Sequence, residues 1–394
     1  MKKLFFFSIL AFLLFTNSLF AQSSYANLYT NLYASASNWS SRFSPIQDFI
    51  KKEPNSPECL SFMQTVADDL IKEAKLVPNP GEKAAWDNCA EQVILFLSKK
   101  GTTQDAETFW KIYQVTKNPT IKSLALQGMG KLQSPLAANR LQLLLESMND
   151  GSSAERLYSE EIAQGAILGL ESLKAASSYR ALFFASNSWY SGTTKRMALK
   201  ALDTLILDDS SSVAKEMSAM ILDPELSLTN VLTILNKSSE IELSSSEKSD
   251  IALAALTHAQ NVLDSLKNKR VRNAIILEAL NNLDDNPENL PALRICLKET
   301  HSVEERVAAI RVLGKYNSEE ALDLLSNLVE DINNKMELGF FRHEVEEPLI
   351  YETINSLGKI KNQKALQLLS SIVSISGYSN GIKQQARNAA QASM

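Results

Sequence analysis

Apolar residues recur at intervals of three and four along most of the chain, which is the period of one face of an α-helix. Val307, Ile310 and Leu313 share such a face, and a second apolar face runs through residues 321–328. A few polar or turn-forming residues separate the two stretches. This alternation predicts pairs of antiparallel helices, that is, helical hairpins.

One nine-residue pattern occurs three times without gaps. Each copy has glycine at its fifth position and lysine at its sixth, and each precedes an amphipathic stretch rich in alanine and leucine. The copies are Leu126–Ser134, Ile310–Ser318 and Ile354–Asn362, and degenerate copies run through 166–182 and 197–217. Self-similarity of this kind is typical of repeat proteins.

Glycine and serine occupy the places where a hairpin needs a turn. We expect Gly130, Gly314 and Gly358 to end the first helix in the left-handed conformation, which glycine adopts without strain. Ser134 and Ser318 are then placed to cap the second helix. One hairpin cannot bury both of its apolar faces, whereas stacked copies can, so the pattern predicts a solenoid.

The predicted hairpins cover most of the chain. They lie near 82–118, 119–150, 155–190, 193–222, 224–266, 268–300, 302–333 and 344–376, and a last helix follows at 380–393. The segment 224–266 fits least well, because its Ser-rich stretch 236–247 is expected to be a loop. The segment 333–345 is expected to be a long inserted turn.

The N-terminal part is less regular. It is expected to form helices near 23–42, 44–52 and 57–75, closed by a turn rich in proline at 78–81. We interpret residues 22–81 as a helical cap on the end of the stack, which a solenoid requires for solubility.

The repeats resemble HEAT repeats, and in particular the short HEAT-like type of the phycobilisome lyases. The resemblance rests on an Ala-rich first helix, its terminal Leu-Gly-Lys and a second helix rich in alanine and leucine. It spans about 82–393 and is strongest at 119–150 and 302–376. It implies an all-α fold, an α-solenoid of stacked HEAT-like helical hairpins over 82–394 behind the cap. The 13 glycines and 11 prolines are too few for a turn-rich β-fold.

The first residues have the order of a secretory leader. Lys2 and Lys3 precede an apolar run at 4–15, and Ala21 is the expected cleavage point. The run is shorter than the ~20 residues that span a membrane, although an uncleaved anchor is the alternative. We therefore expect residues 1–21 to be a signal peptide and the mature chain to be periplasmic or secreted in a bacterial envelope, with no further membrane span.

Charge and cysteine content take a different meaning in an exported chain. Loss of Lys2 and Lys3 changes the formal net charge from −5 to −7, because residues 1–21 contain no acid. An acidic chain is a poor non-specific binder of nucleic acid. In an oxidising compartment Cys59 and Cys89 are candidates for a disulfide, which leaves Cys296 unpaired. The alternative is three buried thiols.

The sequence contains no recognisable catalytic set. Residues 377–381 match the nucleophile-elbow pattern of hydrolases, but no acid or histidine follows Ser379. No two of His258, His301 and His343 lie within one helical turn, and no zinc or calcium spacing is present. We predict no catalytic residues, no metal and no cofactor, and therefore no enzymatic activity.

Large aromatic side chains fall in the turns between hairpins, which lie along one rim of a solenoid. Such side chains are candidate anchors for a partner, and the alternative is that each ring packs on its own hairpin. The candidate partner-binding residues are Trp189, Tyr190, Phe340, Phe341, Arg342 and Tyr378.

These features predict a non-enzymatic exported scaffold that binds a protein or peptide along the solenoid surface. One alternative is a structural envelope component that associates with itself. A weaker alternative, which rests on the repeat type alone, is a factor that handles a chromophore as the lyases do.

Overall fold

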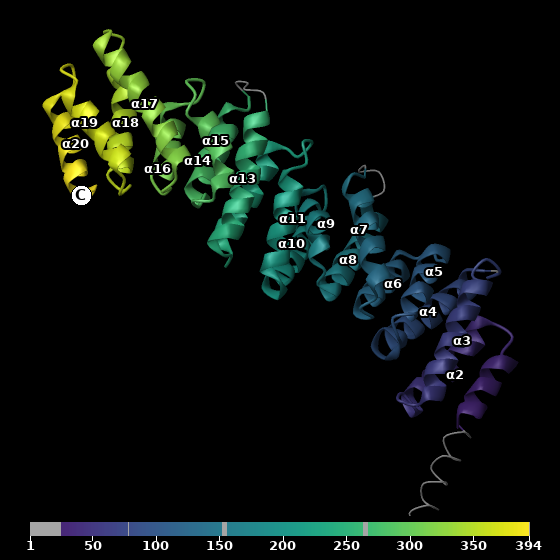
Figure 1. Ribbon diagram of the computed structural model, residues 1–394. Coiled ribbons are helices and arrows are strands. Elements are labelled where there is room, and N and C mark those ends of the chain that lie inside the picture. Colours follow the sequence, from purple (N-terminus) through teal and green to yellow (C-terminus); the bar gives the residue numbers. More distant parts are fainter. Residues whose placement is uncertain (1–24, 78, 152–155, 263–266, 394) are drawn as a thin grey trace, which may run out of the picture. The chain divides into compact units, whose positions relative to one another are not determined.

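A computed structural model describes residues 25–77, 79–151, 156–262 and 267–393 (Figure 1). Within these ranges the regular structure is helical and no strand occurs, so the predicted all-α solenoid is confirmed. The chain divides into two compact units between Asp208 and Asp209. The expected cap belongs to the first unit, and the expected signal peptide lies outside the described residues.

The first unit contains the cap and the first repeats. Its helices are 25–35, α2 (Trp39–Lys52), α3 (Pro57–Glu73), α4 (Pro80–Lys100), α5 (Asp105–Val115), α6 (Pro119–Lys131), α7 (Pro135–Asn149), α8 (Arg156–Leu173), η2 (Ala176–Ser178), α9 (Tyr179–Asn187) and α10 (Gly192–Asp208). The helices α2, α4, α6, α8 and α10 contact one another in succession and form one layer. In the other layer α3 contacts α5, and α7 contacts α9.

The second unit has the same two layers. Its helices are α11 (Ser210–Ile221), α12 (Leu228–Glu240), α13 (Ser245–Asn261), α14 (Lys269–Asn282), η3 (Pro287–Asn289), α15 (Leu290–Cys296), α16 (Val303–Leu313), α17 (Glu319–Glu337), α18 (His343–Leu357), α19 (Gln363–Ser374) and α20 (Asn380–Ser393). The helices α12, α14, α16, α18 and α20 form one layer, and α11, α13, α15, α17 and α19 form the other. The apolar stripes of both layers meet in the core, where Ile310, Leu313 and Leu325 are fully buried.

Side chains fix where most of the helices begin. Ser244 and Ser302 each form a capping box with the glutamate three residues later, and Ser318 accepts a hydrogen bond from the Ala321 amide. A serine cap of this kind contributes about 1 kcal/mol. The expectation that Ser318 caps the second helix of its hairpin is therefore confirmed.

The repeated glycines do not have the conformation expected of them. Gly314 and Gly358 have φ of −66° and −64°, both right-handed, and the positive-φ glycine of the described residues is Gly339. The expectation that Gly130, Gly314 and Gly358 end their helices in the left-handed conformation is therefore wrong.

These glycines instead allow the first helices of consecutive repeats to approach each other closely. A Cβ at Gly130 would lie 2.1 Å from the carbonyl oxygen of Gly169 in α8. A Cβ at Gly314 would lie 2.7 Å from the hydroxyl oxygen of Ser356 in α18, and that hydroxyl donates to the Ile310 carbonyl at 3.0 Å. Glycine is required at these points because the next repeat occupies the space of a side chain.

Three boundaries also differ from expectation. The expected helix 23–42 is divided, because Asn38 and Ser41 form a capping box that starts α2, and α2 then continues through Pro45. The expected loop 236–247 is helical up to Glu240, because Ser238 and Ser239 donate to the Leu235 carbonyl. Serine hydroxyls that are satisfied in this way are compatible with a helix interior.

The expected long turn at 333–345 is the third difference. Helix α17 continues to Glu337 and α18 begins at His343, so the turn is confined to 338–342. The helix extends because its last residues find partners in neighbouring repeats. Lys335 pairs with Glu299 at 2.6 Å, and Met336 fills the space beside Gly377.

Candidate functional site

The turn between α17 and α18 exposes two large apolar side chains. Leu338 is 69% exposed and Phe340 is 70% exposed. Gly339, with φ of +77°, lets the Phe340 amide donate to the Lys335 carbonyl at 2.8 Å. This hydrogen bond and the one from the Gly339 amide to the Met336 carbonyl form a Schellman motif. The turn therefore has a defined backbone, and we call its exposed residues 338–340 the apolar tip.

Phe341 and Tyr378 meet behind the apolar tip. Their rings pack edge to face at 5.9 Å, and the His343 ring lies 5.2 Å from Phe341. Tyr378 is buried, its hydroxyl donates to Asn333 Oδ1 at 2.8 Å, and burial raises its pKa above the ordinary value. Two of the candidate aromatics thus pack against each other, and Tyr378 supports the turn from inside.

Arg342 ties the end of the turn to α18. Its backbone amide and its guanidinium donate to the two carboxylate oxygens of Glu346 at 2.8 and 2.9 Å. Lys335 lies 3.7 Å from the same carboxylate and pairs with Glu299 and Asp331. Burial alone would raise the pKa of Glu346, but the hydrogen bonds and the charges of Arg342 and Lys335 lower it overall.

This ionic tether predicts a stability that depends on pH. The Glu346 carboxylate stabilises the fold fully above the ordinary glutamate pKa of about 4.3, and this contribution is lost as the pH falls through the lowered pKa. Glu346→Gln should cost about 2 kcal/mol at pH 7, and the difference from the unchanged protein should shrink in acid. Urea unfolding at several pH values measures both. Glu344→Gln, in the exposed first turn of α18, is the control, and a difference that does not vary with pH contradicts the tether.

Trp189 and Tyr190 lie in the first unit and pack rather than project. The indole nitrogen of Trp189 donates to the Met148 carbonyl at 3.0 Å, and the two rings lie 4.4 Å apart. Tyr190 is buried. Trp189 thus contacts the end of α7 in the preceding repeat, and Tyr190 packs beside it with Glu160 of its own hairpin nearby.

The three cysteines are free thiols in the buried core. Burial raises the pKa of Cys59 to about 11 and that of Cys89 to about 12, so neither is a reactive thiolate near neutral pH. In this structure the candidate disulfide Cys59–Cys89 is not formed, and all three cysteines are buried thiols, as the alternative interpretation has it.

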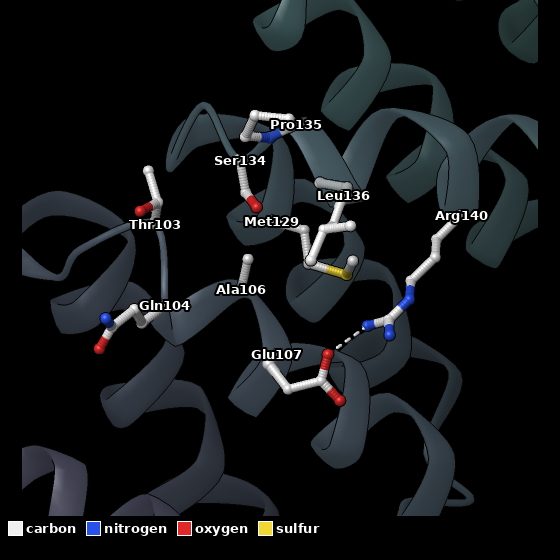
Figure 2. A pocket seen from close by; sticks show the side chains of 10 residues that line it. Thr103, Gln104, Ala106, Glu107, Met129, Ser134, Pro135, Leu136 and Arg140 are labelled. Atoms are coloured by element: carbon white, nitrogen blue, oxygen red, sulfur yellow. Dashed lines mark hydrogen bonds and ion pairs between the residues drawn. The ribbon is translucent and has the colours of Figure 1, made fainter.

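A cavity that the sequence did not reveal lies between α5 and α7 in the first unit (Figure 2). Its volume is about 440 Å³. Ser134 and Pro135 border it at the start of α7, and Arg140 reaches across to pair with Glu107 at 2.6 Å. The sequence predicts Ser134 as a helix cap, but its side chain caps nothing, so that expectation is wrong. A serine that caps a helix and a serine that does not both stand directly before the helix in the sequence. The sequence therefore contains no signal that distinguishes them.

The described residues contain neither a metal-binding cluster nor a membrane-spanning helix. No group of three or more histidine, cysteine, aspartate or glutamate side chains is placed to hold a metal ion in these ranges. Among the helices described, none combines the length and the apolar character that a membrane crossing needs.

Comparison with known proteins identifies the repeats. The PBS lyase HEAT-like repeat model matches residues 305–331, which cover most of α16 and the first part of α17. No curated protein matches the chain. A structure of human deoxyhypusine hydroxylase in complex with glycerol is similar at 14% identity, over 86% of this chain and 99% of that one. Its TM-score of 0.28 is too low to support any argument about activity. The matched repeat and the stacked hairpins around it show that the chain folds as a solenoid of HEAT-like repeats.

Proposed function

We propose that the chain is a non-enzymatic scaffold that binds a protein or peptide partner through the apolar tip. HEAT-like hairpins supply a helical surface, and the turn 338–342 presents two large apolar side chains, Leu338 and Phe340, on a tethered backbone. The proposal of an exported, periplasmic or secreted protein rests on the leader pattern of residues 1–21.

The exposure of Phe340 is the observation that carries the proposal. Aromatic anchors dominate the binding energy of protein interfaces, and an anchor on a fixed backbone loses little conformational entropy on binding. The Schellman motif and the Arg342–Glu346 bonds hold this turn before any partner arrives. Phe341 belongs to the support of the tip, because its ring faces Tyr378.

Phe340→Ala should leave folding intact and strongly weaken binding. An exposed side chain contributes within about 0.5 kcal/mol to stability, whereas an anchor costs above ~2 kcal/mol of binding free energy, about thirtyfold in affinity. The measurement is capture of partners from an extract of the source cells by the tagged protein, with a thermal melt in parallel. Leu207→Ala is the matched control, because Leu207 is an exposed apolar residue of the first unit.

Three outcomes are informative. Loss of one captured protein with Phe340→Ala and not with Leu207→Ala supports the proposal. Equal capture by both variants contradicts it. Capture of a second copy of the chain favours the structural, self-associating alternative.

A further inference from the structure

The cavity between α5 and α7 has an apolar floor and a polar edge. Ala106, Met129 and Ala137 are all buried and line the floor. Ser134 and the first turn of α7 form the edge. This site is in the first unit and is independent of the apolar tip.

The Ser134 hydroxyl lacks the partner that a helix cap normally has. Ser134 has the extended backbone of a cap residue, with φ of −79° and ψ of 127°, yet its side chain accepts nothing from α7. No hydrogen bond to this hydroxyl exists within the described residues, although the residue is only 5% exposed. Ser56 also precedes a proline at a helix start, and its hydroxyl accepts from the Cys59 amide at 3.1 Å. Figure 2 shows the Ser134 oxygen directed toward Met129 and Ala106.

A second hydrogen-bond donor, at the start of α7, also lacks an acceptor in the described part of the chain. Pro135 has no N–H, and the Leu136 amide finds no acceptor among the described residues. The 15-residue helix has no acidic side chain in its first turn. The partial positive charge of the helix N-terminus is therefore uncompensated where it borders the cavity.

The charged groups at the cavity indicate which anion fits. Arg140 is paired with Glu107 at 2.6 Å, and its guanidinium lies over the Trp110 ring at 5.3 Å. Its charge is thus matched within the protein, as the dashed line in Figure 2 shows. The helix N-terminus supplies about half an elementary charge, which suits one carboxylate better than a phosphate dianion.

We propose that this cavity binds the C-terminal carboxylate of a peptide whose last side chain is apolar. The carboxylate accepts from the Ser134 hydroxyl and the Leu136 amide. The last side chain, attached to the neighbouring carbon, rests on Met129 and Ala106. An internal aspartate has peptide groups on both sides. Its binding would place these polar groups on the apolar floor without hydrogen-bond partners, which costs free energy.

The test uses three short peptides and the full chain. The probes are N-acetyl-Ala-Leu with a free C-terminus, the same peptide as C-terminal amide, and an N-acetylated, amidated peptide with an internal aspartate. Calorimetric titration should show binding of the free acid and at least tenfold weaker binding of the other two. Equal binding of acid and amide, binding of the aspartate peptide as well as the free acid, or no binding of the free acid overturns the proposal.

Two substitutions locate the site. Ser134→Ala should weaken binding of the free acid about five- to tenfold without changing the thermal melt, because the hydroxyl makes no bond in the fold. Ser134→Asp puts a carboxylate at the same donors, so it should block binding while the protein stays folded. Ser147→Ala, an exposed hydroxyl near the other end of α7, is the control and should bind as the unchanged chain does. Unaltered binding in Ser134→Asp contradicts the assignment.

Discussion

Gly130→Ala should destabilise the first unit by about 3 kcal/mol, at the upper end of the cost of overpacking a core. The new Cβ would lie 2.1 Å from the Gly169 carbonyl oxygen and 2.5 Å from the Gly169 Cα, so backbone must move on one side or the other. The helices α6 and α8 are the first helices of consecutive hairpins and contact each other directly. The shift therefore moves these two hairpins apart. Urea unfolding followed by circular dichroism measures the loss.

A matched glycine in the same unit gives the opposite expectation. A Cβ at Gly192 would meet only the tip of the Arg196 side chain, at 3.6 Å. Gly192→Ala should therefore leave stability unchanged or raise it by up to about 1 kcal/mol, since alanine favours the helix over glycine. If both variants unfold at the same urea concentration, the close approach of α6 and α8 is not what requires Gly130.

Glu305→Ala should cost about 3 kcal/mol in the second unit. Glu305 is buried, and its carboxylate lies 2.8 Å from Nδ1 of His301 and accepts from the Ser302 amide at 3.1 Å. In the amide orientation that satisfies its neighbours, Asn273 of α14 also donates to Glu305 at 3.0 Å. Alanine removes half of the capping box of α16 and takes away the buried carboxylate that these three groups contact.

The neighbouring residue provides the control for this prediction. Glu304 is in the same first turn of α16, but its side chain is exposed. Glu304→Ala should change the free energy of unfolding by no more than about 0.5 kcal/mol. A comparable loss for Glu304→Ala would show that charge at the helix N-terminus, and not the buried network, is what stabilises this repeat.

The hairpins could be predicted because they depend on local signals. The spacing of apolar residues, and the Asn-Pro pairs at the starts of α4 and α6, place the hairpins at 82–118 and 119–150 close to where they are found. The role of Gly130 could not be predicted in the same way. A left-handed turn and a close approach both exclude a Cβ, and only the position of α8 distinguishes them.

In the candidate site, too, local features could be predicted and features that depend on distant residues could not. Phe340 was identifiable because it follows a glycine in a turn between repeats, and its exposure agrees with that interpretation. The length of the turn was overestimated, because the partners that extend α17, Glu299 and Gly377, are distant in sequence. The cavity beside Ser134 was missed, since only the orientation of one hydroxyl separates it from an ordinary helix cap.

Photo-crosslinking at position 340 tests directly whether the apolar tip binds a protein partner. A benzophenone amino acid replaces Phe340 in one version of the chain and Leu207 in another, and both are exposed to the same extract of the source cells. We expect a single crosslinked protein at position 340 that is absent at position 207. The same products at both positions, or no product at position 340, would contradict it.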